Sequence, residues 1–124
     1  MLSGDWTSKT VLYEYKTTAN AVLFSETDAY DATWSFSSSN VTLKTAGISD
    51  VTSKYAITTE SGIQYISFDN KNIAVINKYE IKSRTATSLT LSASDTDIVN
   101  TIYFENGIPK KADKVVYTIT LNKK

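Results

Sequence analysis

Carboxylates are the side chains of this chain best suited to acid–base chemistry. The sequence contains no histidine and no cysteine, which removes the commonest general base, the thiolate nucleophiles and most zinc ligands. Glu26, Asp28 and Asp31 come close together, and a pair of carboxylates is what a glycosidase uses. Acidic residues gathered in one predicted loop are usually solvated charges, and function depends on a complete site. We therefore expect a protein that is not an enzyme.

A second acidic segment, Asp95-Thr96-Asp97, offers the hard oxygen ligands that calcium prefers. It lacks the glycine and the distal glutamate of a calcium-binding hand. Turns in which an aspartate side chain accepts a hydrogen bond from the backbone use the same residues. The sequence thus predicts no metal site and no cofactor.

Charge and hydropathy exclude two classes of partner. Lys and Arg total 13 and so do Asp and Glu, whereas a nucleic-acid-binding protein carries a basic excess because phosphate contacts dominate its affinity. No apolar run approaches the roughly 18 residues of a membrane span. We expect no nucleic-acid partner and no transmembrane segment.

The residues that could form a binding site belong to short runs in which apolar and polar residues alternate, bounded by turn residues. Trp6 is out of phase with Val11, Tyr13 and Tyr15, which predicts a bulge near residues 8–10. Residues 18–30 are irregular and are expected to form a long loop or one turn of helix. The runs cover residues 6–17, 33–37, 41–43, 54–58, 63–68, 73–83, 89–91, 98–104 and 115–121.

Serial hairpins without a helix predict an all-β fold. Neighbours in sequence then become neighbours in space, and an antiparallel meander removes its two edges by closing on itself. We expect a single domain over residues 1–124, an up-and-down meander β-barrel of about eight strands. The alternative is a β-sandwich of two sheets.

Gly4-Asp5-Trp6, followed by a long strand and a meander, resembles the lipocalin-like (calycin-type) barrels. The resemblance is to the short lipocalin-like domains of secreted bacterial lipoproteins. In that family the tryptophan of G-x-W begins the first strand and plugs the closed end of the barrel, and Trp6 matches it. A late arginine often packs on this tryptophan, but the only arginine here is Arg84.

The resemblance implies a location outside the cytoplasm, in the periplasm or at the cell surface, with a lipid anchor upstream of Met1. It also implies that residues 18–30 overhang the open end of the barrel. Their apolar cluster, Val22, Leu23 and Phe24, would then form a lid with Phe24 directed toward the cavity.

Two functions remain open. The resemblance implies a non-catalytic binding module that holds a small apolar or amphipathic ligand inside the barrel; the alternative is a structural or protein-interaction domain whose barrel is filled. A ligand site needs a few hundred Å³, whereas a filled core leaves voids near the size of a water molecule. The residues expected to line the interior or the lid are Phe24, Trp34, Phe36, Leu43, Tyr55, Tyr79, Leu91, Phe104 and Tyr117.

Overall fold

Alternation of apolar and polar residues produces antiparallel strands along the chain. The computed structural model describes residues 2–73 and 76–124, and these residues form strands and turns without a helix. No helix of this described part could therefore cross a membrane. The strands are β1 (Gly4–Lys16), β2 (Val22–Phe36), β3 (Asn40–Lys44), β4 (Val51–Glu60), β5 (Ile63–Phe68), β6 (Lys78–Arg84), β7 (Ser88–Asp95), β8 (Ile102–Glu105), β9 (Ile108–Lys111) and β10 (Lys114–Lys123).

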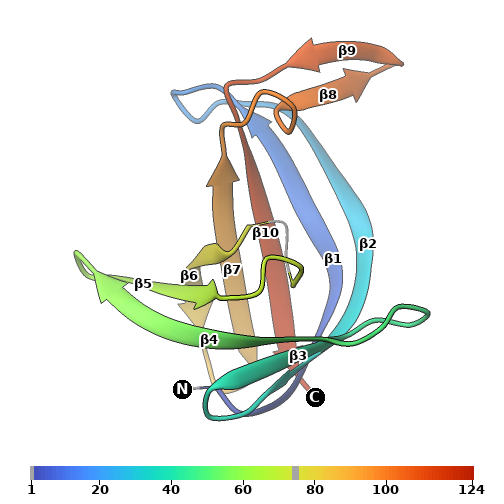
Figure 1. Ribbon diagram of the computed structural model, residues 1–124. Coiled ribbons are helices and arrows are strands. Elements are labelled where there is room, and N and C mark those ends of the chain that lie inside the picture. The colour runs from blue at the N-terminus through green and yellow to red at the C-terminus, as the bar shows by residue number, and fades with distance from the viewer. Residues whose placement is uncertain (1, 74–75) are drawn as a thin grey trace.

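Eight of these strands form a closed antiparallel barrel in the order β1-β10-β7-β6-β5-β4-β3-β2. Strand β1 closes the ring because it pairs with β2 on one side and with β10 on the other. The remaining strands, β8 and β9, pair with each other as a hairpin inserted between β7 and β10. The prediction of an all-β meander barrel is confirmed, and the sandwich alternative is not (Figure 1).

The barrel interior depends on a bulge in β1. The register of β1 shifts between Thr7 and Val11 against β10, and between Ser8 and Thr10 against β2, as the sequence predicted. Below the bulge Ser8 is buried, and its Oγ accepts a hydrogen bond from Trp34 Nε1 at 3.3 Å and donates to the Tyr30 carbonyl at 2.9 Å. The bulge therefore places a buried hydroxyl where it satisfies two other polar groups.

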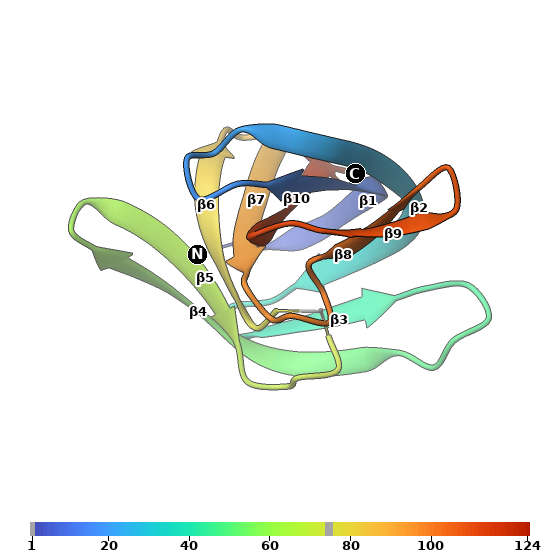
Figure 2. The same ribbon diagram turned by 90° about the horizontal axis from the view of Figure 1, so that it is seen from above.

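The ring is complete only around the lower half of its longest strands. Strand β2 pairs with β3 over Thr33–Phe36 alone, so residues 22–32 have β1 on one edge and no described strand on the other. Above the ring, β2, β1, β10 and β7 continue together (Figure 1). The β8–β9 hairpin lies across this upper end (Figure 2). The upper half of the barrel thus has an open side.

The loop predicted over residues 18–30 is wrong. A turn occupies only residues 17–21, where Asn20 has φ 68° and its N–H donates to the Thr17 carbonyl at 3.0 Å. The following residues already belong to β2 and pair with β1. This part of β2 lies outside the closed ring, so its sequence is polar and shows no clean alternation. It is nevertheless a strand because it pairs with the long strand β1. A lid built from this segment does not exist.

Two other boundaries differ from the sequence prediction. The run predicted from Ile73 becomes a strand only at Lys78, and Ile73 is buried in the preceding turn; Val75 of that run lies outside the described residues. The break predicted at residues 106–109 is confirmed at Asn106 and Gly107, which have φ 52° and 77° and join β8 to β9, whereas Ile108 and Pro109 already belong to β9. Two positive φ angles at Asn-Gly are typical of the tightest hairpin turn.

Leu91, fully buried inside the barrel, and Ile108, 58% exposed on the hairpin, are a matched pair for testing where the core lies. We expect Leu91→Ala to lower the free energy of unfolding by about 2–5 kcal/mol, because it leaves a cavity. Ile108→Ala is expected to change it by less than about 0.5 kcal/mol. Urea denaturation followed by tryptophan fluorescence measures both. Equal effects would contradict the assignment of the core to the barrel interior.

Candidate functional site

Seven of the nine residues predicted for the barrel interior or the lid fall into three groups. Trp34, Phe36 and Leu91 are buried as filling of the core. Tyr55 is half-buried and holds the N-terminal segment, because its hydroxyl lies 2.9 Å from the Leu2 carbonyl oxygen and 2.7 Å from that of Ser37. The third group, Leu43, Tyr79 and Tyr117, lines a cavity.

The prediction that Phe104 points inward is wrong. Phe104 is 64% exposed on β8, and its neighbour Tyr103 is buried instead. Successive residues of a strand face opposite sides, so an error of one residue exchanges the buried side chain for the exposed one. Tyr103 was missed for this reason.

Phe24 anchors the hairpin rather than gating the barrel. Its ring stacks on Tyr103, with centroids 5.2 Å apart and an interplanar angle of 9°, and lies 6.2 Å from the Tyr15 ring. Tyr15 is itself 5.1 Å from Tyr103. This aromatic cluster attaches β8–β9 to the upper end of the barrel, because offset and tilted ring pairs add to the stabilisation from burial.

The cavity has a volume of about 380 Å³ and is lined by inward-facing residues of the barrel. Strands β1, β2, β3, β4, β6 and β10 contribute to its wall, together with the β3–β4 and β5–β6 connections. Among the described residues that line it, none carries a charged side chain. They are Val11, Tyr13, Tyr30, Leu43, Thr45, Ile48, Ser49, Val51, Asn72, Ile73, Tyr79, Tyr117 and Ile119.

Four tyrosines converge on this cavity. Burial raises the pKa of Tyr79 to about 12, against an opposing backbone hydrogen bond from Ile76, and it raises the pKa values of Tyr13, Tyr30 and Tyr117 as well. The charge on Tyr13 also raises the pKa of each of the other three tyrosines, and the charges on Tyr30 and Tyr117 raise the pKa of Tyr79. The four hydroxyls therefore lie close together. They are neutral at physiological pH.

Three of these hydroxyls are available to a ligand. Those of Tyr13, Tyr30 and Tyr117 form no hydrogen bond with any residue that the structure describes. The rings of Tyr13 and Tyr117 meet edge to face at 5.3 Å, which fixes their orientation. Sequence reasoning could have found Tyr13, which alternates with Val11 and Tyr15, but Tyr30 was assigned to a loop.

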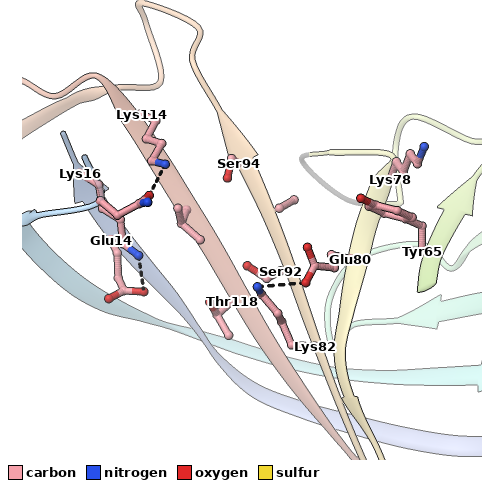
Figure 3. A pocket seen from close by; sticks show the side chains of 13 residues that line it. Glu14, Lys16, Tyr65, Lys78, Glu80, Lys82, Ser92, Ser94, Lys114 and Thr118 are labelled. Carbon is pink, nitrogen blue, oxygen red and sulfur yellow. Dashed lines mark hydrogen bonds and ion pairs between the residues drawn. The ribbon is translucent and has the colours of Figure 1, made fainter. Parts of the chain in front are cut away.

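A second hollow, of about 560 Å³, lies on the outer face of β1, β10, β7, β6 and β5 (Figure 3). Four lysines line it, and each already has a partner. Lys16 lies 3.9 Å from Glu14, Lys82 lies 2.9 Å from Glu80, and Lys114 donates to Asn20. The fourth, Lys78, lies 2.6 Å from Glu60 and packs over the Tyr65 ring. Such exposed pairs contribute little to stability. They nevertheless leave each lysine of this outer groove with a partner inside the protein.

No protein family matches the chain, and no curated protein matches it. A solved structure similar to it is that of a DUF4909 family protein from Staphylococcus aureus. The two chains share 17% sequence identity over 90% of this chain and 95% of the other, with a TM-score of 0.38.

The buried tyrosine predicts a pH dependence. The pKa of Tyr79 is about 12 in the folded protein and about 10 in an unfolded chain, so the folded state holds this proton more tightly. Its contribution is complete below about pH 10 and is lost as pH rises toward 12, by about 2–3 kcal/mol in total. In denaturant unfolding, the stability of the wild type should therefore fall relative to that of Tyr79→Phe as the pH rises above about 10, by up to that amount. A difference that stays constant from about pH 8 upward would contradict the burial of this hydroxyl.

Proposed function

We propose that this chain is a lipocalin-like binding domain, not an enzyme, that holds one small apolar or amphipathic ligand in its barrel. The observation that carries the proposal is the cavity of about 380 Å³. Ligand pockets begin at about 300 Å³ and combine apolar walls with a few placed polar groups. Here the walls are aliphatic and aromatic, and the unbonded hydroxyls of Tyr13, Tyr30 and Tyr117 supply the polar groups.

The lower end of the barrel supports the lipocalin-like assignment. Trp6 begins the first strand and is buried at that end, and the Lys123 ammonium lies 5.3 Å from its ring. Arg84 borders the same hollow beside Trp6. The resemblance implies an arginine packed on the tryptophan of the G-x-W motif, and in this chain a lysine near the C-terminus takes that place.

The hairpin favours a second candidate, a protein-interaction domain. Ile98, Val99, Phe104 and Ile108 are each more than half exposed in the segment between β7 and β10. Apolar side chains gathered on a surface are typical of contact sites. In this alternative the hairpin would hold a partner protein and the cavity would remain without a ligand.

A location outside the cytoplasm, with a lipid anchor upstream of Met1, is proposed on the resemblance alone. The complete open reading frame tests it. A reading frame that starts at Met1 without an upstream signal segment would overturn it.

Binding of the uncharged fluorescent probe N-phenyl-1-naphthylamine tests the proposed function. We expect the wild type to bind it and Val51→Trp to lose at least about tenfold in affinity, because Val51 lines the cavity and the larger ring occupies it. Ile63→Trp, on an exposed position of β5 outside the cavity, is the control and should bind as the wild type does.

Near-ultraviolet circular dichroism establishes that each variant is folded. If Val51→Trp does not fold, Thr45→Trp blocks the cavity from the β3–β4 side. A wild type that binds no probe, or a filled variant that binds as well as the wild type, would refute the proposal.

A further inference from the structure

Carboxylates border the tyrosine cavity on the open side of the barrel. Glu26, Asp28 and Tyr30 occupy alternate positions of β2 and therefore face the same side, and Tyr30 lines the cavity. Across the strand pair, Asp28 lies opposite Val11 and Glu26 lies opposite Tyr13. Opposed residues of paired strands share a face, and both of these β1 residues line the cavity as well. The two carboxylates thus extend from the face that holds the ligand.

Both carboxylates are exposed to solvent at the rim of the cavity, and few groups of the protein pair with them. Asp28 forms no hydrogen bond or ion pair with any described residue, and Glu26 accepts one hydrogen bond, from the Tyr15 hydroxyl at 3.3 Å. Both carboxylates add to the effect of burial in raising the pKa of Tyr13. Their negative potential therefore reaches the hydroxyl end of a ring that forms the cavity wall.

The opposite edge of the same face is also acidic. Asp95 lies opposite Val115 at the end of β7, in the inward series that includes Tyr117 on β10. Asp95 accepts hydrogen bonds from the Asp97 amide and from Asn100 Nδ2, each at 2.8 Å. These bonds hold its charge in place. After burial, the Asp95 charge is the largest cause of the raised pKa of Tyr117.

Four basic side chains of the barrel strands face the other way. Lys16 on β1, Lys114 on β10, and Lys78 and Lys82 on β6 all line the outer groove (Figure 3). Within the described residues, the cavity wall therefore contains no cation to compensate an anionic ligand. A buried charge without a partner is costly, so an ionised fatty acid fits this site poorly.

Tyr117 brings an unpaired polar group to the cavity. The residue is only 5% exposed, but its hydroxyl forms no hydrogen bond with a described residue and is not among the buried unsatisfied atoms, so it remains accessible from the cavity. Its ring and that of Tyr13 also present aromatic faces and edges next to the carboxylates, and aromatic faces attract cations.

We propose that the ligand is a cationic amphiphile: an apolar body that fills the cavity, with an amine or quaternary ammonium group held at its mouth between Asp28, Glu26 and the tyrosines. This inference rests on the proposed function and adds the sign of the ligand's charge. The apolar body accounts for the aliphatic wall, and the positive group accounts for the uncompensated carboxylates.

Three probes of equal chain length test the sign: decyltrimethylammonium, decanol and decanoate, each below its micelle concentration, in competition with N-phenyl-1-naphthylamine. An opposite charge nearby favours the charged form by at least about tenfold. The ammonium compound should therefore bind at least about tenfold more tightly than the alcohol, and decanoate most weakly. The advantage of the ammonium compound should fall as salt is added.

Asp28→Asn combined with Glu26→Gln should remove the preference while leaving decanol binding unchanged, since both replacements keep the shape and an acceptor for Tyr15. Asp31→Asn is the matched control, because it removes the same charge from the same strand at a side chain out of phase with Glu26, Asp28 and Tyr30 and 3.9 Å from Lys9. It should retain the preference.

Equal binding of the three probes, or a preference that survives the double substitution, overturns the inference and leaves the proposed function standing. Failure of every probe, the naphthylamine included, overturns both. Inward charges on an unpaired strand edge can also serve to prevent edge-to-edge association. If the double variant self-associates in sedimentation and the wild type shows no preference for the ammonium compound, the carboxylates protect the edge and the inference is wrong.

Discussion

The pairing of β1 with both β2 and β10 is the interaction on which the rest of the structure depends. It joins the two ends of the chain and closes the ring, which leaves the lower barrel without an unpaired edge. Because β1, β2 and β10 are longer than β3 and β5, the same pairing also carries three strands beyond the point where the ring is complete. A closed, filled lower half and an open upper half follow from this difference in strand length.

The bulge in β1 makes the two halves compatible. Without it, Trp6 and Ser8 could not share the inner face with Val11, because period-two alternation separates odd from even positions only while the register holds. The shift adds one position, so that a tryptophan closes the lower end and a tyrosine row faces the upper cavity. The irregular register of β1 thus allows one strand to supply both the plug of the lower end and part of the cavity wall.

The sequence predicted the fold class and most strands because apolar and polar residues alternate strongly where one face of a strand is buried in the barrel and the other faces solvent. Tyr79 and Ile81 on β6 and Tyr117 and Ile119 on β10 are examples. It failed over residues 18–30, where the inner face of β2 is open to solvent and carries Glu26 and Asp28. With acidic residues on the inner face and Ser25 and Thr27 on the outer face, this segment has no readable alternation. The candidate site was predicted in part for the same reason: Leu43, Tyr79 and Tyr117 come from strands with clear alternation, whereas Tyr30 and the carboxylates beside it come from the strand that sequence reasoning did not find.

A tyrosine inside a barrel is less favourable than a phenylalanine unless its hydroxyl has a hydrogen-bond partner. The tyrosines at the cavity therefore distinguish the upper half of the barrel from the lower half. A phenylalanine would bury the same ring without a hydroxyl that needs a partner. In the lower half Trp34 Nε1 donates to Ser8, whereas Trp6 Nε1 is buried without a partner among the described residues. In the upper half the hydroxyls of Tyr13, Tyr30 and Tyr117 have no such partner among the described residues. A polar group that the fold itself leaves unsatisfied is costly in a core but useful in a binding site, because a ligand that satisfies it gains affinity and one that cannot is rejected. The unpaired tyrosine hydroxyls of the described residues therefore lie at the cavity, which is where a ligand of the proposed kind would bind.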